Sequence, residues 1–180
     1  GVLGAVAAIL LFARVYRQPP LGILDLCAAG LPLGHAFGRI GCFLNGCCHG
    51  FRCHGPGGVR FPAGSMPWRE QVSQGLIDSS AASSLPVVPT QLIESAANLA
   101  VFAVLYAVAR RHPRPGHVTA LYLVLYAVVR FYTEMLRGDS RLLVGTLSIG
   151  QIVSLLLLVI GIGVLLALWI RPRRADPPAA

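Results

Sequence analysis

The feature that most constrains this chain is the stretch from Leu147 to Ile170, in which 24 consecutive residues include no charged side chain. About 20 apolar residues are enough for an α-helix to cross the hydrocarbon core of a bilayer. Four more apolar segments precede this stretch, at residues 1–13, 21–40, 89–109 and 117–136. Because backbone polar groups in hydrocarbon must be bonded within their own segment, all five segments are predicted to be helices. We therefore expect an all-α, polytopic membrane helix bundle with about five transmembrane helices.

The composition excludes several other classes of protein. Only 12% of the 180 residues are charged and the mean hydropathy is +0.68, whereas about 25% of the residues of a soluble globular protein are charged. A soluble domain, a disordered chain and a small disulfide-stabilised scaffold are therefore excluded. The 15 basic residues are all arginine and contribute to a net charge of +8. They are too sparse to form the dense basic surface that binds nucleic acid, so no nucleic acid partner is expected.

Arginine residues are concentrated in three of the regions that flank these segments. They are Arg14 and Arg17, then Arg110, Arg111 and Arg114, and finally Arg171, Arg173 and Arg174. If all five segments span the membrane, the three clusters lie on one side, and arginine-rich short loops mark the cytoplasmic face. The Gly/Pro/Ser-rich loop 41–88 and the turn 138–146 then lie on the other side. We expect a bundle domain over residues 1–170, with loop 41–88 extracytoplasmic between the second and third helices, and a cytoplasmic Arg/Pro-rich tail over 171–180.

Two further expectations concern the loop and the start of the chain. For loop 41–88 we consider either an apolar patch of Phe61, Met66 and Trp68 at the membrane interface or an ordinary flexible loop, because long structureless loops are usually functional or disordered. Gly1 lies inside an apolar run with no basic segment before it, unlike the start of a secretory signal peptide. We interpret the chain as the C-terminal part of a longer protein, truncated at its N-terminus.

The segment 117–136 and the residue that follows it carry polar side chains at helical spacing. Tyr126, Arg130, Glu134 and Arg137 recur every four, four and three residues, which places them on one face of a helix. A charged side chain at bilayer depth costs at least about 2.5 kcal/mol, so such residues normally face a cavity or a partner. The alternative is an ion pair within the helix, with arginine reaching the headgroups along its aliphatic stem.

Two other segments bring charged residues to the same side of the predicted bundle. Glu94 follows Pro89 near the outer start of its segment, where a simple stabilising interaction with the helix dipole is the alternative role. Arg39 lies at the outer end of segment 21–40. With Arg130 and Arg137 it would supply guanidinium groups, which match phosphate oxygens in a bidentate manner. We therefore predict a site for an anionic phospholipid headgroup.

Four motifs together resemble one known family. Residues His35–Gly50 are similar to the signature of prolipoprotein diacylglyceryl transferases, and Pro89–Glu94 resembles the Pro-Ser/Thr-Gln-Leu-Tyr-Glu motif of that family. Tyr126–Arg137 resembles its Tyr-Gly-x-x-Arg-Phe-x-x-Glu-x-x-Arg helix, and Leu147–Gln151 the start of its last helix. The motifs occur in the family's order over most of the chain. The family has about seven transmembrane helices, two of them upstream of the region matched here.

The resemblance implies a reaction, partners and a location. The diacylglyceryl group of phosphatidylglycerol is transferred to the lipobox cysteine thiol of a prolipoprotein signal peptide, which is the first step of bacterial lipoprotein maturation, and glycerol phosphate is released. This takes place in the bacterial inner (cytoplasmic) membrane, with a multi-pass enzyme whose active face is extracytoplasmic. No metal or soluble cofactor is implied.

The resemblance also implies roles for particular residues. Arg39 and Arg130 would hold the phosphate and stabilise the charge that develops on the leaving group. The other catalytic or lipid-binding positions carried over are Glu94, Tyr126, Glu134 and Arg137 around those arginines, and Asn45 and Gly50 in the signature loop. A family His-Gly-Gly motif would lie just before this chain, with Gly1 as its last residue, so the general base is expected upstream. His35 is expected to be a packed or hydrogen-bonded residue.

This sequence departs from the family pattern mainly through cysteine. Cys42 replaces a signature Asn, Cys47 replaces the signature Glu, and Ala127 replaces a Gly. Cys42, Cys47, Cys48 and Cys53 lie near His49 and His54. Three interpretations of this group are open: one or two disulfides, a Cys/His metal site, and simple packing. A membrane thiol–disulfide oxidoreductase and a non-catalytic lipid-binding protein are the alternative functions.

Overall fold

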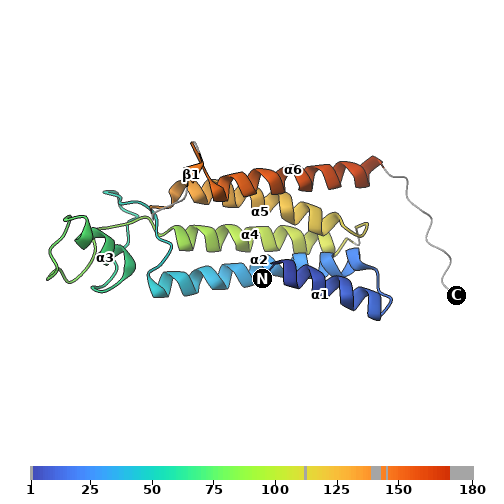
Figure 1. Cartoon of the computed structure of the whole chain (residues 1–180), viewed down its shortest axis with the longest axis horizontal. Coiled ribbons are helices and arrows are strands. Elements are labelled where there is room, and N and C mark those ends of the chain that lie inside the picture. Colours follow the sequence, from blue (N-terminus) through green and yellow to red (C-terminus); the bar gives the residue numbers. More distant parts are fainter. Residues whose placement is uncertain (1, 112, 139–142, 145, 171–180) are drawn as a thin grey trace.

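The computed structural model describes residues 2–111, 113–138, 143–144 and 146–170. Its long helices lie side by side, and a folded loop extends beyond one end of the bundle (Figure 1). The elements in chain order are α1 (Val2–Val15), α2 (Pro20–Asn45), α3 (Met66–Ser73), α4 (Thr90–Ala109), α5 (His117–Leu136), β1 (Leu143–Val144), β2 (Leu147–Ser148) and α6 (Ile149–Ile170).

The predicted helical bundle is confirmed, with one difference in the number of spans. Among the described residues, α2, α4, α5 and α6 are long and apolar enough to cross a membrane. The helix α1 has 14 residues and rises only about 21 Å, less than the roughly 30 Å of a bilayer's hydrocarbon core. The described residues therefore include four candidate spans and one shorter apolar helix, where about five spans were expected.

The helix α2 continues beyond its predicted end at residue 40, to Asn45. It ends in a Schellman motif, a turn that closes a helix through a left-handed residue. Gly46 has φ 70°, its N–H donates to the Phe43 carbonyl (3.1 Å), and the Cys47 N–H donates to the Cys42 carbonyl (3.1 Å). Cys42 therefore lies on the helix and Cys47 just after it.

The loop between α2 and α4 is folded and includes the helix α3, which the sequence did not predict. Phe61 is 5% exposed and Val87 1% exposed, while Met66 is largely exposed. Trp68 Nε1 donates to the Ala81 carbonyl (2.7 Å). Because Phe61 is buried inside the loop and Trp68 is hydrogen-bonded to its backbone, these three residues do not form one exposed apolar patch. The position of the loop relative to the membrane remains a prediction.

A short antiparallel ribbon precedes the last helix. Leu143 pairs with Ser148 and Val144 with Leu147. The last apolar segment therefore begins as a strand, and α6 starts at Ile149 rather than Leu147. Within the described residues this short ribbon is added to the predicted helical bundle.

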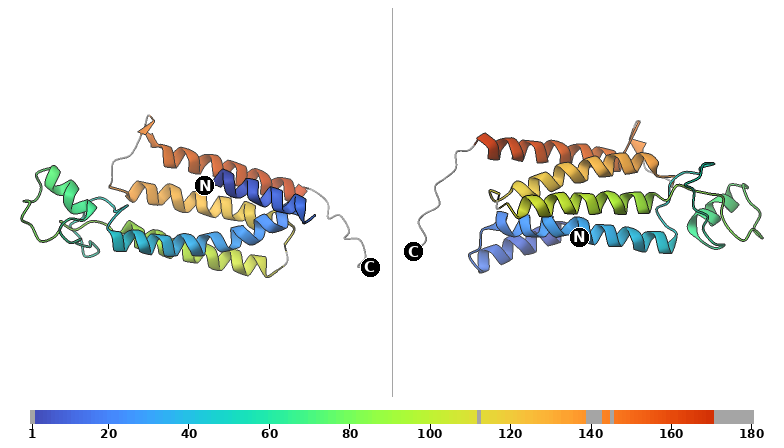
Figure 2. Two further views of the ribbon diagram at one scale, coloured as in Figure 1. Left: turned by 60° about the horizontal axis from the view of Figure 1, so that its bottom comes forward. Right: turned by 180° about the vertical axis from the view of Figure 1, so that it is seen from behind.

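The connections at the end of the bundle opposite the folded loop lie close together (Figures 1 and 2). Arg114, between α4 and α5, donates from Nη1 to the Leu168 carbonyl of α6 (2.6 Å). Asp25 of α2 accepts hydrogen bonds from the N–H groups of Gly116 (2.7 Å) and Thr119 (2.8 Å). This side chain caps the start of α5 from a neighbouring helix. The first two predicted arginine clusters therefore share one end, whereas residues 171–180, with the third cluster and the predicted tail, lie outside the described residues.

Candidate functional site

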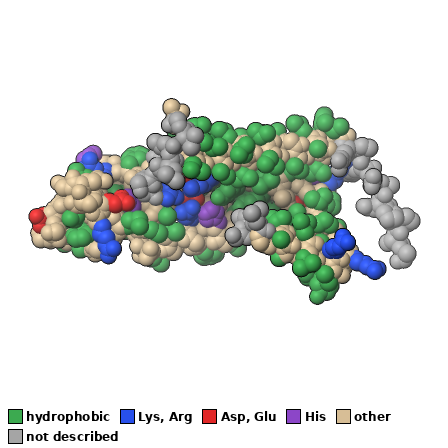
Figure 3. Space-filling view, viewed as in Figure 1, with side chains coloured by type: hydrophobic (Ala, Val, Ile, Leu, Met, Phe, Trp, Pro, Cys, Tyr) green, Lys and Arg blue, Asp and Glu red, His purple; other side chains and the backbone are tan. Residues whose placement is uncertain are grey.

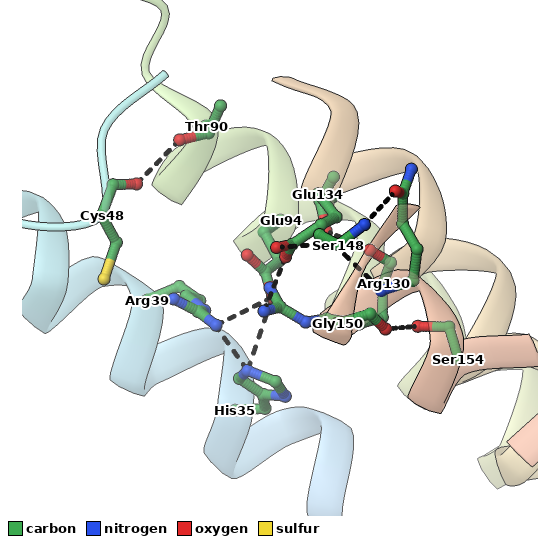
Figure 4. Close-up of polar contacts among 12 residues, drawn as sticks. His35, Arg39, Cys48, Thr90, Glu94, Arg130, Glu134, Ser148, Gly150 and Ser154 are labelled. Carbon is green, nitrogen blue, oxygen red and sulfur yellow. Dashed lines mark hydrogen bonds and ion pairs between the residues drawn. The ribbon is translucent and has the colours of Figure 1, made fainter. Parts of the chain in front are cut away.

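Charged side chains from three helices meet near the loop end of the bundle (Figure 4). Arg39 Nη2 of α2 lies 3.0 Å from Glu94 Oε1 of α4. Arg130 Nη2 of α5 lies 2.7 Å from Glu134 Oε2 one turn along the same helix. Arg130 Nη1 lies 4.0 Å from the same Glu94 oxygen, so Glu94 links the two arginines. We call Arg39, Glu94, Arg130 and Glu134 the ion cluster; the structure brings these predicted residues together.

The ion cluster is largely shielded from solvent within the protein. The side chain of Glu94 is 4% exposed and that of Arg130 20% exposed. Buried charges are costly unless they are paired, and two arginines with two carboxylates give a balanced set. Among the described residues, Arg130 Nη1 is buried without a hydrogen-bond partner. A buried guanidinium N–H in this state is a ready donor for the oxygen of an anionic ligand.

The start of α6 shapes the surroundings of Glu134. Ser148 and Gln151 form a reciprocal capping box: the Ser148 N–H donates to Gln151 Oε1 (2.9 Å), and the Gln151 N–H donates to Ser148 Oγ (3.2 Å). Ser148 Oγ also donates to Glu134 Oε1 (3.1 Å). A Cβ on Gly150 would lie 2.9 Å from the Glu134 carboxylate. The absence of a side chain at Gly150 therefore leaves the space that Glu134 occupies.

His35 of α2 also contacts the ion cluster, although the sequence did not indicate which residues it contacts. Arg39 Nε donates to His35 Nε2 (3.3 Å), and the same ring nitrogen lies 3.6 Å from Glu94 Oε1. The expectation of a hydrogen-bonded histidine is therefore confirmed. The ring of Tyr126 lies 5.7 Å from that of His35, so this predicted residue reaches the cluster through His35. The signal available in the sequence was the four-residue spacing between His35 and Arg39.

Gly50 holds the signature loop against the ends of α4 and α5. Its N–H donates to the Val88 carbonyl (2.9 Å), and it forms a β-bridge with Arg137, the residue that follows α5. A Cβ at Gly50 would lie 2.7 Å from the Leu136 carbonyl oxygen and 2.8 Å from Thr90 Cγ2. Glycine is therefore required for this close approach, and the bridge between Gly50 and Arg137 joins the signature loop to the end of α5.

The first residues of α4 fasten the same loop. Thr90 Oγ1 donates to the Cys48 carbonyl (2.8 Å), and Gln91 Nε2 donates to the Cys47 carbonyl (2.7 Å). Both side chains are almost fully buried. The helix that carries Glu94 therefore also fixes the backbone of the two adjacent cysteines.

The cysteines are free thiols in the structure. The structure therefore does not contain the disulfides that were one of the interpretations. The sulfur atoms of Cys42, Cys47 and Cys48 lie within 4.8 Å of one another, and Cys53 is not part of this group. Asn45 is exposed at the end of α2 and hydrogen-bonds the Cys47 thiol. Burial raises the pKa of that thiol, but hydrogen bonds from Asn45, the neighbouring thiols and the backbone outweigh burial, and the pKa is lowered overall.

His49, considered as a metal ligand from the sequence, has other partners. Its Nε2 lies 3.2 Å from Glu70 Oε2 of α3, and its Nδ1 lies 2.9 Å from the Gly50 carbonyl oxygen. This buried ring therefore ties α3 to the signature loop.

An apolar groove of about 260 Å³ runs between α5 and α6. It is lined by Ala127, Val128, Phe131, Tyr132, Ser154, Leu155 and Leu158. Charged and histidine side chains gather between the apolar surface of the helices and the loop end of the molecule (Figure 3). The ion cluster and the groove both involve α5. Arg130 of the ion cluster is adjacent in sequence to Phe131, which lines the groove.

Comparison with known proteins gives a consistent set of relatives. Residues 1–167 match the family described as prolipoprotein diacylglyceryl transferase. The chain is 33% identical over 161 residues to phosphatidylglycerol–prolipoprotein diacylglyceryl transferase 2 of Clostridium perfringens, covering 89% of this chain and 57% of that protein. The corresponding enzyme of Verminephrobacter eiseniae is 35% identical over 183 residues, covering 100% and 60%. That of Gloeobacter violaceus is 36% identical over 176 residues, covering 97% and 60%. The chain thus spans less than two thirds of the length of these relatives.

Proposed function

Because the chain belongs to the prolipoprotein diacylglyceryl transferase family, we propose that it provides the phosphate-binding part of an enzyme that modifies prolipoproteins. The enzyme transfers the diacylglyceryl group of phosphatidylglycerol to the thiol of a lipobox cysteine. The observation that carries this proposal is the ion cluster, in which Arg39 and Arg130 share Glu94 and Arg130 keeps a buried donor without a hydrogen bond.

The chemistry of the transfer assigns a role to the two arginines. The thiol sulfur forms a bond to the glyceryl CH₂ group while the bond between that carbon and a phosphate oxygen breaks. The electron pair of the broken bond leaves with glycerol phosphate, and the thiol proton passes to a base. Negative charge therefore develops on the phosphate, where preorganised guanidinium groups stabilise the transition state.

The charge balance of the ion cluster suits reversible binding of a phosphodiester. A bound phosphodiester adds one negative charge to a set whose charges already cancel. It can approach Nη1 of Arg130, which lies 4.0 Å from Glu94, without breaking the 2.7 Å pair between Arg130 and Glu134. Glu134 then acts as a positioning residue that keeps Arg130 in place.

The groove between α5 and α6 suits an acyl chain of the same lipid. Its lining is mainly apolar, and Phe131 brings it next to Arg130 along α5. Arg130 and the groove together match a lipid, which has an anionic headgroup and long hydrocarbon chains.

The arginine distribution supports an orientation for the enzyme. Arg17 and Arg111 belong to connections at the end of the bundle opposite the folded loop, and arginine-rich short loops favour the cytoplasmic side. The active face is then extracytoplasmic, in the bacterial inner membrane, where phosphatidylglycerol and prolipoprotein signal peptides are the partners.

The test uses the full-length gene product in phosphatidylglycerol vesicles with a lipobox peptide, and it measures the mass gain of the peptide. Arg39→Ala and Arg130→Ala should each lower the rate by about 10²–10³-fold, the loss typical of removing one donor to a developing oxyanion. Arg69→Ala, an exposed arginine of α3, is the matched control. No mass gain in any lipid mixture, or full activity in both variants, contradicts the proposal.

The close thiols favour one alternative, a membrane thiol–disulfide oxidoreductase. In that case Cys47→Ser or Cys48→Ser abolishes turnover and Arg130→Ala retains it. Headgroup binding through Arg39 and Arg130 without any mass gain instead identifies a non-catalytic lipid-binding protein. The peptide assay, run beside a disulfide-reduction assay, separates these outcomes.

A further inference from the structure

Three thiols gather where α2 ends, and two of them, Cys42 and Cys47, stand where the family pattern has Asn and Glu. Cys42, Cys47 and Cys48 offer sulfur atoms within 4.8 Å of one another. Thiolates on a tetrahedral zinc ion, with Zn–S bonds of about 2.3 Å, lie about 3.8 Å apart. The sulfur atoms are therefore at most about 1 Å farther apart than one zinc ion requires.

The local backbone explains how three thiols come together. The Schellman motif pairs Cys42 with Cys47, because it sets the third residue before the end of a helix against the second residue after it. This capping contact accounts for two of the thiols. Cys48 has φ 59°, a left-handed conformation that costs a non-glycine residue about 1–2 kcal/mol. That conformation lets the side chains of two adjacent cysteines face one group.

The α4 side chains hold this conformation in place. Thr90 Oγ1 donates to the Cys48 carbonyl and Gln91 Nε2 to the Cys47 carbonyl, at 2.8 and 2.7 Å. Strained backbone of this kind is concentrated at functional sites, where the surrounding structure fixes it. The hydrogen bonds therefore preorganise the thiols relative to α4, the helix that carries Glu94.

The number of thiols points to an open metal site. Closed structural zinc sites have four protein ligands, whereas catalytic sites have three and leave the fourth position for water or substrate. Of the other nearby candidates, Cys53 lies outside the three-thiol group and His49 pairs with Glu70. Thiolate ligands select soft or borderline ions such as Zn²⁺.

We propose that Cys42, Cys47 and Cys48 bind a zinc ion as thiolates and that the fourth coordination position takes the acceptor cysteine thiol of the substrate. The second half of this inference rests on the proposed transferase function. A thiol bound to zinc loses its proton, which is released to solvent. The resulting sulfur nucleophile forms the S–C bond as the C–O bond of the phospholipid breaks, and the electron pair leaves with glycerol phosphate. The reaction needs no oxidant or reductant.

The site adjoins the groups that hold the phosphate. Cys42 follows Arg39 by three residues on α2, so the two side chains lie on one face of the helix. The Cys48 sulfur points toward the side of the site where Arg39 lies (Figure 4). An acceptor thiol bound at this site would therefore lie on the side of α2 where Arg39 is proposed to hold the phosphate, as a displacement at the carbon between them requires.

The first test is spectroscopic, with Co²⁺ as the probe and the reduced full-length gene product in phosphatidylglycerol vesicles. We expect one Co²⁺ per chain and an intense thiolate-to-cobalt absorption band that added Zn²⁺ removes. Loss of a residue that only hydrogen-bonds to a metal ligand lowers metal affinity by about 10–100-fold, and loss of a ligand itself should cost more. Cys47→Ser should therefore weaken binding by more than about 100-fold.

Cys53→Ser, a loop cysteine outside the three-thiol group, is the matched control and should bind Co²⁺ like the wild type. Thermal unfolding shows whether each variant is folded. The displacement of Co²⁺ by Zn²⁺ is measured in the wild-type protein, so it does not depend on the folding of any variant. Absence of the band in the reduced wild type, or equal losses in Cys47→Ser and Cys53→Ser, overturns the metal site.

The second test adds a lipobox peptide to the Co²⁺-loaded protein. The band should shift with the cysteine peptide and stay unchanged with the peptide in which serine replaces the cysteine. An unchanged spectrum with the cysteine peptide overturns the fourth-ligand role.

Activity distinguishes failure of this inference from failure of the proposed function. Peptide mass gain that persists undiminished after zinc is removed by a chelator overturns the inference and leaves the transferase function intact. A Co²⁺ band with no peptide mass gain in the zinc-loaded protein overturns the transferase function and with it the acceptor role of the site.

Discussion

At the scale of single residues, the position of Glu134 depends on residue 150 being a glycine, which has no side chain. Gly150 faces the Glu134 carboxylate so closely that a Cβ would lie 2.9 Å from it. Glu134 in turn forms the 2.7 Å pair with Arg130. Because Gly150 lies against Glu134 and Glu134 pairs with Arg130, a small change at Gly150 should move the Arg130 guanidinium, which is proposed to hold the phosphate.

The Gly150→Ala variant tests this dependence. The added methyl group should push the Glu134 carboxylate away and misplace Arg130, and a displacement of about 1 Å can cost about 100-fold in rate. We expect peptide mass gain to slow by about 10- to 100-fold, with a smaller change in unfolding temperature. Gly163→Ala on the same helix, where nothing lies within 4 Å of the added Cβ, is the control and should keep full activity. Equal activity in the two variants would falsify the role of Gly150.

Part of the ion cluster follows from patterns in the sequence, and some of its contacts do not. Arg130 and Glu134 follow from the four-residue period of one helix, and Arg39 and Glu94 from the alternating direction of the helices. Ser148, which donates a hydrogen bond to Glu134, lies in the short strand β2, which no helical pattern includes. The left-handed backbone conformation of Cys48 depends on hydrogen bonds from α4. One of them comes from Thr90, which is 42 residues away in the sequence. No local rule specifies contacts of this kind.

At the scale of elements, the sequence predicted the apolar helices and missed the structure between them. Hydrophobicity identified the segments of α2, α4, α5 and α6, because burial in lipid or in a bundle requires a long apolar run. The helix α3 is short and polar, and its position depends on contacts such as the pair between His49 and Glu70. The junction of the signature loop with α4 and α5 is likewise formed by backbone pairing that side-chain patterns do not encode.

The Gly50→Ala variant tests that junction. The new Cβ would lie 2.7 Å from a backbone oxygen of Leu136, which cannot move as a flexible side chain can. We expect a loss of about 1–3 kcal/mol in the free energy of unfolding, as for other overpacked sites, together with faster amide exchange over residues 46–51. The measurement is denaturant unfolding in detergent combined with hydrogen exchange.

The control for this junction is Gly57→Ala, also in the loop, where nothing lies within 4 Å of the added Cβ. A surface substitution of this kind should change stability by less than about 0.5 kcal/mol. If Gly50→Ala is as stable as Gly57→Ala and its amide exchange is unchanged, the loop is not held at Gly50 as described.

At the scale of the whole molecule, the two ends of the bundle differ in chemistry. The ion cluster, the three thiols and the folded loop lie toward one end, where α2 and α5 finish and α4 and α6 begin. The opposite end has the arginine-bearing connections and the hydrogen bond from Arg114 to the end of α6. This polarity gives the proposed site a defined side of the membrane, so the orientation can be tested apart from the activity.

The orientation is tested by adding one cysteine at either end and labelling it in spheroplasts with a membrane-impermeant maleimide. Ser79→Cys is an exposed position in the folded loop, and Gln18→Cys is an exposed, uncharged position between α1 and α2. Because arginine-rich short loops stay on the cytoplasmic side, Ser79→Cys should be labelled in intact spheroplasts and Gln18→Cys only after permeabilisation. Peptide mass spectrometry assigns each label to its residue, so the native cysteines do not interfere. The reverse pattern would turn the ion cluster toward the cytoplasm and contradict the proposed extracytoplasmic active face.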